Sequence, residues 1–125
     1  FTESILKRKK LYLYNKGNNY RDFTYIEDLI INLRKLIYLK NKKGSYNIIN
    51  ISSGKKIKIL NLVRILEKHL NKKAKIKLEK KIPTDIPESL SYSRKLKKLF
   101  VVKKSTSFEK GIKKFVTWYK SYYNA

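Results

Sequence analysis

One arginine in a short polar stretch of this sequence stands where it could bind a phosphate. Residues 20–28 read Tyr-Arg-Asp-Phe-Thr-Tyr-Ile-Glu-Asp, and Arg21 lies just before the expected start of a helix. An arginine side chain presents a planar fork of N–H donors that matches phosphate oxygens, and a helix N-terminus favours anions. This arrangement predicts a ligand that carries phosphate.

Acidic neighbours offer Arg21 a purely structural role instead. Asp22, Glu27 and Asp28 all lie close to it in the sequence, and any of them could pair with the guanidinium on the surface. We expect Glu27 and Asp28 to serve the helix N-terminus, where acidic side chains interact favourably with the helix dipole. The residues alone leave both roles of Arg21 open.

The helix that follows Arg21 is predicted from its cap and its periodicity. Thr24 and Glu27 have the spacing of a capping box, in which each side chain bonds the other residue's backbone N–H. Apolar residues then recur at helical spacing, and they predict a helix over about 25–39 that ends at 41–44. Thr106 and Glu109 form a second such pair, before a helix expected over 105–123.

Alternating patterns place the other elements and indicate an α/β or α+β fold in one domain, residues 1–125. In the helix at 59–70, four residues form one apolar face, namely Leu62, Val63, Leu66 and Leu70. The remaining predictions are strands at 11–14, 46–51 and 74–78, helices at 2–10 and 93–99, a turn at 15–19, and a loop at 79–91 around two prolines. Three short strands make a thin sheet, so we expect another domain to cover much of its apolar surface.

The charge suggests a second class of function. The chain carries 32 Lys+Arg against 9 Asp+Glu, a net charge of +23, which would attract nucleic acid or an anionic surface. The cations are mostly lysines spread over the whole chain with abundant Asn, Ile and Tyr, a mixture that an AT-rich coding sequence also produces. Nucleic-acid sites concentrate charge and use arginine for directed contacts. A basic binding module therefore remains the alternative, and a non-functional remnant a third interpretation.

The usual catalytic and metal-binding patterns are missing from the sequence. It contains no cysteine and one histidine, His69, which we expect on the solvated side of its helix. Tyr12 with Lys16, and Tyr38 with Lys42, have a Tyr-x-x-x-Lys spacing that is expected by chance among so many tyrosines and lysines. We therefore predict no catalytic, cofactor-binding or metal-binding residue in this chain. No apolar run is long enough to span a bilayer, so the prediction is a cytoplasmic protein.

Several motifs together resemble the C-terminal half of nucleotide-sugar epimerases, which are extended short-chain dehydrogenases, and most of all UDP-glucuronate 4-epimerases. The most specific is the stretch at 21–28. The others follow in order along the chain, at 14–17, 46–53, 85–87 and 108–119. The resemblance implies a small substrate-binding subdomain whose Rossmann half is absent, and the missing initial Met favours a fragment of a longer chain.

The resemblance also implies roles for five residues. Tyr12, Leu13 and Tyr14 would line the uracil of a UDP-sugar, Arg21 would contact its diphosphate, and the loop that holds Asp85 would close over the ribose and phosphates. Where this chain has Thr84, the family usually has Gly, and where it has Ile82, related enzymes often have Arg or Gln.

In that family, oxidation and reduction at C4 of the sugar depend on NAD and on a Tyr-x-x-x-Lys pair in the N-terminal half. The NAD fold needs a glycine-rich strand-to-helix turn, whereas all four glycines here stand alone. The resemblance therefore implies the substrate-binding half of an NAD-dependent isomerase that serves surface-polysaccharide precursor synthesis. Its partners would be a UDP-sugar and the N-terminal Rossmann half, in an enzyme that could be a homodimer. The sequence leaves open which nucleotide sugar is bound, and whether the enzyme is an epimerase, a dehydratase or a decarboxylase.

Overall fold

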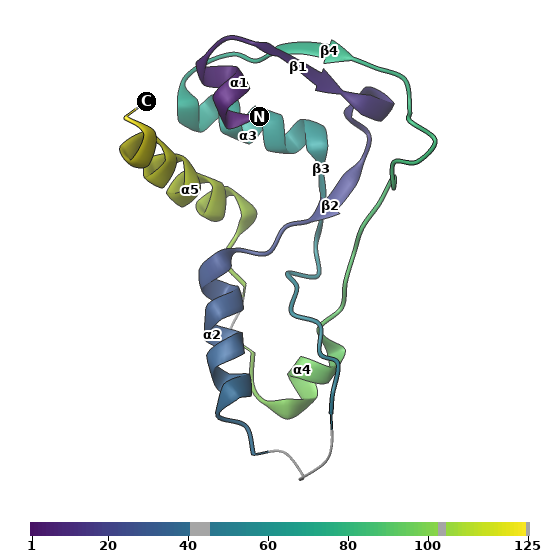
Figure 1. Cartoon of the computed structure of the whole chain (residues 1–125), viewed down its shortest axis with the longest axis vertical. Coiled ribbons are helices and arrows are strands. Elements are labelled where there is room, and N and C mark those ends of the chain that lie inside the picture. Colours follow the sequence, from purple (N-terminus) through teal and green to yellow (C-terminus); the bar gives the residue numbers. More distant parts are fainter. Residues whose placement is uncertain (41–45, 103–104, 125) are drawn as a thin grey trace.

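The computed structural model describes residues 1–40, 46–102 and 105–124, and its elements form an upper and a lower group (Figure 1). The upper group holds α1 (Thr2–Leu6), β1 (Lys10–Leu13), a 3₁₀ turn (Tyr14–Gly17), α3 (Ile59–Leu70), β4 (Lys75–Leu78) and α5 (Phe108–Tyr123). The lower group holds α2 (Ile26–Ile37) and α4 (Arg94–Leu99). Two short strands, β2 (Tyr20–Asp22) and β3 (Lys56–Lys58), connect the groups.

The hydrophobic core lies in the upper group and is organised on α3. The predicted bounds of this helix are confirmed, as is its apolar face, because Leu62, Val63, Leu66 and Leu70 are all buried. One cluster of buried residues joins α3 to α1 and α5, and a second joins it to β1. The first cluster comprises Ile5, Leu62, Leu66, Leu70 and Val116. The second comprises Leu11, Leu13 and Val63.

The strands form two small sheets, and the mixed α/β class predicted from the sequence is confirmed. β1 pairs with β4 in parallel, with Leu11 opposite Ile76. β2 pairs with β3 antiparallel, with Arg21 opposite Ile57. The strand predicted at 46–51 is wrong for the described residues, since no pairing of this segment occurs among them. A β-branched run favours extended backbone, but a strand also needs a partner with free backbone groups.

Both predicted capping boxes are wrong, although both helices form. The N-cap of α2 is Tyr25, without a side-chain hydrogen bond, and Glu27 bonds other side chains. The N-cap of α5 is Ser107, whose Oγ accepts from the N–H of Lys110 at 3.4 Å. Thr106 instead bonds Asp28. In both places a tertiary contact outweighs the local pairing that the spacing suggested.

The other elements lie close to their predicted positions. The strand near 11–14, the turn after it, the strand near 74–78, the 79–91 loop and the short helix near 93–99 all form. α1 is shorter than predicted, and β2 and β3 were not predicted. The predicted end of the second helix at 41–44 lies outside the described residues. No helix within the described ranges has the length and apolar character needed to cross a membrane.

The position of the core leads to a stability prediction. Leu66→Ala, in the buried face of α3, should lower the free energy of unfolding by about 2–4 kcal/mol because it leaves a cavity. The matched change Leu33→Ala, on exposed α2, should cost less than about 1 kcal/mol. Urea denaturation followed by circular dichroism measures both. Equal losses would show that α2 and α3 contribute equally to the core of this chain.

Candidate functional site

Three consecutive residues of β2 connect to segments far away in the sequence. The backbone of Tyr20 bonds the 79–91 loop, with its N–H to the Pro87 carbonyl at 2.9 Å and its carbonyl to the Ser89 N–H at 3.1 Å. This pairing lays the loop alongside β2. The side chain of Arg21 bonds Asp85 in the same loop, and that of Asp22 bonds both this loop and residues 53–54. β2 is therefore the meeting point of the candidate site.

Arg21 and Asp85, which are 64 residues apart, meet in an ion pair. Arg21 Nη2 lies 3.0 Å from Asp85 Oδ1, and Arg21 Nη1 donates to the Tyr20 carbonyl at 2.8 Å. Both side chains are about 30% exposed, so solvent and a ligand can reach them. Arg21 therefore pairs with none of its acidic sequence neighbours, and two of the five sequence-predicted site residues lie together.

Two asparagines of the predicted turn at 15–19 extend this cluster. Asn19 is 5% exposed, and its Nδ2 donates to the second carboxylate oxygen of Asp85. Asn15 Nδ2 in turn donates to Asn19 Oδ1 at 2.8 Å. Asn15 has a φ of 49°, a left-handed conformation that asparagine tolerates better than most residues. Both oxygens of Asp85 are thus engaged, and the carboxylate is held in one orientation.

The three residues predicted to line a base lie at the end of β1, in two different environments. Leu13 is 2% exposed and packs in the core with α3, so its side chain faces away from solvent. Tyr12 points to the opposite face, where Lys77 Nζ lies 5.4 Å from the ring centroid. Tyr14 begins the turn that leads to Asn15 and Asn19 and is 44% exposed. The two tyrosines, and not Leu13, offer aromatic surface.

The carboxylate of Asp22 organises the chain behind this cluster. Its Oδ1 accepts from the N–H and the hydroxyl of Ser53 at 3.2 and 2.5 Å. Its Oδ2 accepts from the N–H groups of Gly54 and Ser91 at 3.1 and 3.3 Å. Gly54 has a φ of +70°, which glycine adopts readily. One charged side chain therefore holds two loops against β2.

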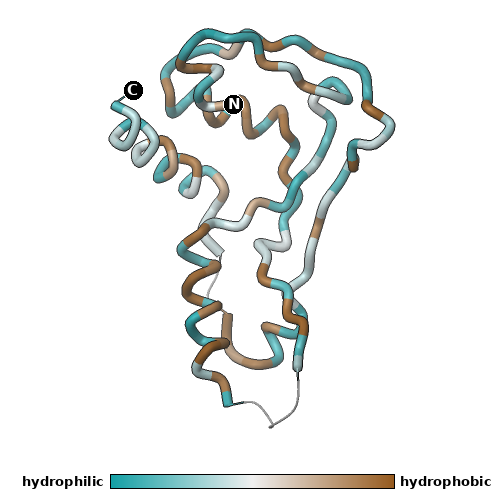
Figure 2. Tube along the Cα trace, in the orientation of Figure 1, coloured by the Kyte–Doolittle hydropathy of each residue, from teal (hydrophilic) through white to brown (hydrophobic). Residues whose placement is uncertain are grey.

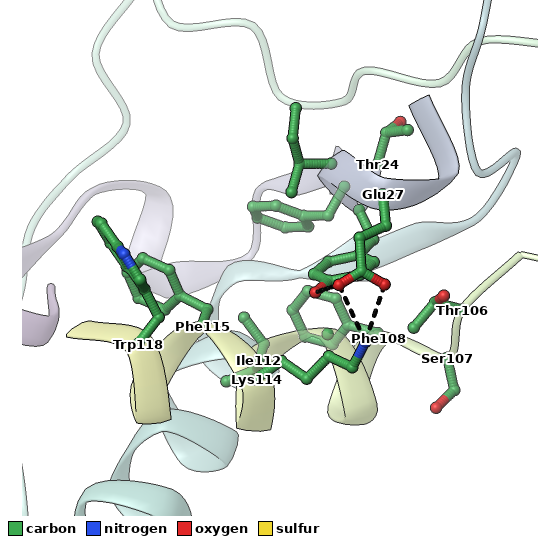
Figure 3. A pocket seen from close by; sticks show the side chains of 13 residues that line it. Thr24, Glu27, Thr106, Ser107, Phe108, Ile112, Lys114, Phe115 and Trp118 are labelled. Carbon is green, nitrogen blue, oxygen red and sulfur yellow. Dashed lines mark hydrogen bonds and ion pairs between the residues drawn. The ribbon is translucent and has the colours of Figure 1, made fainter. Parts of the chain in front are cut away.

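A separate apolar groove of about 700 Å³ lies between the start of α2 and α5. Figure 3 shows Phe108, Ile112, Phe115 and Trp118 along α5, with Glu27 reaching across to Lys114 at 2.8 Å. Tyr25 packs on Gly111, where an added Cβ would lie 3.3 Å from its ring. The groove is mostly apolar and offers no clustered catalytic groups.

His69 has a different environment from the solvated one predicted. Its side chain is 16% exposed, and its Nε2 lies 3.8 Å from Glu109 Oε1. α5 packs across α3 here, and the sequence of one helix alone could not indicate that. Within the described residues, no group of three or more His, Asp and Glu side chains is placed to hold a metal ion.

The chain is similar over almost its whole length to a part of several UDP-glucuronate 4-epimerases. It is 36% identical over 137 residues to UDP-glucuronate 4-epimerase 1 of Arabidopsis thaliana, a match that covers 98% of this chain and 32% of the relative. It is 33% identical over 125 residues to a UDP-glucuronate 4-epimerase of Thermodesulfobacterium geofontis, covering 96% and 36%. The chain thus spans roughly a third to two fifths of its curated relatives. No protein-family model matches it.

Solved structures give the same result for the fold. The crystal structure of a UDP-glucuronic acid 4-epimerase from Bacillus cereus, in complex with UDP-glucuronic acid and NAD, superposes with a TM-score of 0.84 and 26% identity. This match covers 98% of the present chain and 38% of that enzyme. A dTDP-glucose 4,6-dehydratase of Bacillus anthracis, in complex with NAD, shares the fold with a TM-score of 0.78. The match lies in the C-terminal region of these enzymes.

The hydrogen bonds of Asp22 predict a strong dependence of stability on its charge. Asp22→Asn keeps the shape of the side chain but removes its charge, and it places the new NH₂ group against backbone N–H donors. The substitution should therefore lower the free energy of unfolding by about 2–3 kcal/mol. Glu88→Gln, which removes an exposed ion pair with Lys56, should change it by less than about 0.5 kcal/mol. Urea titrations of both variants measure the difference, and equal effects would contradict the role of Asp22.

The Glu27–Lys114 pair predicts a small acid-sensitive contribution to stability. The hydrogen bond from Lys114, and then that from the Tyr25 hydroxyl, lower the pKa of Glu27 below 4.5. A lowered folded-state pKa stabilises the fold above the unfolded value, and the contribution disappears as the pH falls through the folded-state pKa. Glu27→Gln should therefore flatten the decline of Tm as the pH falls below about 5. Parallel Tm curves for the two proteins would show that the pair contributes nothing.

Proposed function

We propose that this chain, which corresponds to the C-terminal region of UDP-glucuronate 4-epimerases and related extended short-chain dehydrogenases, binds the UDP part of a nucleotide sugar. The observation that carries the proposal is the meeting of Arg21 and Asp85 at 3.0 Å, in a position that solvent can reach. A cation and a carboxylate placed together offer one group for the charged phosphates and one for the hydroxyls of a ribose.

Arg21 would bind the diphosphate. A guanidinium has five N–H donors, and the bonds to Asp85 and to the Tyr20 carbonyl use two of them. Donors remain for a phosphate, while the bond to the Tyr20 carbonyl keeps the side chain in place. A charge-assisted, forked contact of this kind binds a diphosphate better than a lysine would.

Asp85 would face the ribose, since a carboxylate accepts from sugar hydroxyls and repels phosphate. Asn19 and Asn15 would keep its orientation, and the pairing of Tyr20 with the 79–91 loop would keep the loop closed. Tyr12 and Tyr14 supply aromatic surface on which a uracil can stack. Leu13 would contribute only by positioning these two neighbours, because its side chain is in the core.

The oxidation and reduction of the sugar belong, in this proposal, to the part of the relatives that this chain does not span. The structural neighbours are NAD complexes, yet the sequence of this chain has no glycine-rich strand-to-helix turn. NAD would therefore bind to a preceding Rossmann part, and NAD supplies hydride transfer there. The chain described here would hold and orient the substrate. The assembled enzyme would act in the cytoplasm on precursors of surface polysaccharides.

Titration with UDP tests the role of Arg21. Isothermal titration calorimetry should show saturable binding, and Arg21→Ala should weaken it roughly ten- to hundredfold, because each hydrogen bond to a charged group contributes about 1.5–3 kcal/mol. Arg64→Ala removes one positive charge from the exposed surface of α3 and serves as the control. If UDP does not bind, or if the two variants bind equally weakly, the proposal fails.

A further inference from the structure

Asn19 is a buried polar residue of the candidate site, and hydrogen bonds hold it in place. The segment around it, residues 14–22, has no strongly apolar residue, and Figure 2 shows it in teal and white beside the brown positions of α3. Asn19 is 5% exposed. Its backbone carbonyl accepts from the Ile59 N–H at 2.8 Å, and its side-chain oxygen accepts from Asn15 Nδ2 at 2.8 Å. These bonds offset the cost of burying an amide.

The carboxylate of Asp85 is shared between Asn19 and Arg21. Asn19 Nδ2 donates to Asp85 Oδ2, and Arg21 Nη2 donates to Asp85 Oδ1 at 3.0 Å. The other terminal nitrogen of the guanidinium, Nη1, donates to the Tyr20 carbonyl. Arg21 and Asp85, both within the described part of the chain, therefore share one hydrogen bond, although a fork of two parallel bonds is the stronger geometry for these groups. Asn19 engages the oxygen that such a fork would need.

This arrangement leaves Asp85 able to accept from a ligand through both of its oxygens. An ionised carboxylate has about four lone-pair positions, and within the described ranges Asn19 and Arg21 each fill one, on different oxygens. The side chain of Asp85 is 28% exposed, so a ligand can reach the remaining positions. Two acceptors side by side match two hydroxyls on neighbouring carbons, which is the arrangement of the 2′- and 3′-hydroxyls of a ribose. A 2′-deoxyribose offers only the second of these hydroxyls.

We propose that Asn19 is a positioning residue that makes the site selective for a ribonucleotide over a 2′-deoxyribonucleotide. The proposal rests on the proposed function and narrows its class of ligand. The fold alone leaves this choice open, because it is shared by an epimerase solved with UDP-glucuronic acid and by a dTDP-glucose 4,6-dehydratase, and dTDP carries a deoxyribose. Asn19 is too buried to touch the nucleotide and acts through Asp85.

The loss of Asn19 should affect the two kinds of nucleotide differently. Without its amide, the second oxygen of Asp85 turns to Arg21 and completes the fork, which fills acceptor positions that the ligand hydroxyls need. A ribonucleotide then loses a partner for its 2′-hydroxyl, whereas a 2′-deoxyribonucleotide has no such hydroxyl to lose. With Asn19 in place, the deoxyribonucleotide is the poorer ligand, because it leaves a polar group of the site unpaired.

Calorimetric titration with UDP and with 2′-deoxy-UDP, which differ in one hydroxyl, tests the proposal. The unchanged chain should bind UDP about ten- to a hundredfold more tightly than 2′-deoxy-UDP, as expected for one hydrogen bond to a charged group. Asn19→Leu, which keeps roughly the volume and removes the amide, should reduce this ratio to less than about threefold. Partial unfolding of a variant weakens both ligands by the same factor and leaves the ratio unchanged. Asn18→Leu, at the exposed neighbouring position, is the matched control and should keep the full ratio.

Asn15→Gly gives a second test that does not depend on the folding of Asn19→Leu. Glycine readily adopts the φ of 49° found at Asn15, and the change removes the side-chain bond that orients Asn19. It should lower the ratio in the same direction.

Two results would overturn the proposal while the proposed function stands. One is a chain that binds UDP through Arg21 but binds 2′-deoxy-UDP equally well. The other is a ratio that stays at its full value in Asn19→Leu or, if that variant does not fold, in Asn15→Gly. A chain that binds neither nucleotide would instead contradict the proposed function, and this inference with it, so the two failures can be told apart.

Discussion

The carboxylate of Asp22 is the interaction on which the site depends most. It accepts four hydrogen bonds, from Ser53, Gly54 and Ser91, and so holds two loops against a strand of three residues. A strand that short has little stability of its own. Its neighbours Tyr20 and Arg21 use the same strand to hold the 79–91 loop and Asp85. Without Asp22, the position of Arg21 would lose its support.

The hydrophobic core and the candidate site occupy different parts of the molecule. The buried residues gather on α3, where the neighbouring helices and β1 supply the two core clusters. α2 is attached through polar contacts and leaves an apolar stripe, formed by Ile26, Ile30, Leu33 and Ile37, exposed to solvent. The candidate UDP site lies at β2, between these two regions.

Local patterns were enough to predict most of the helices. α3 begins and ends where its period of apolar residues predicts, since the same residues that give the helix its face also fill the core. β1 was predicted from a short apolar run before a turn, and β4 from alternating apolar and basic residues. The stretch around Arg21 was recognised from residue types alone. Each of these features depends on neighbours within one or two turns of chain.

Features that depend on distant residues could not be predicted in this way. Thr24 and Thr106 have the spacing of capping residues, yet Ser107 caps α5 and Thr106 bonds Asp28, 78 residues away. The strand at 46–51 was predicted from its β-branched residues. The strand that pairs with β2 is instead β3, at residues 56–58, and Asp22 holds the loop just before β3 against β2.

The sequence by itself determined that Arg21 could bind a phosphate-bearing ligand and where most of the helices would form, because side-chain chemistry and short-range periodicity are local properties. Only the tertiary structure decided that Arg21 meets Asp85 and not its acidic neighbours, and that α2 turns its apolar stripe outward. Both depend on the path of the chain between residues tens of positions apart. The physical reason is that a hydrogen bond or a buried contact stabilises a fold only after the chain has brought its two partners together.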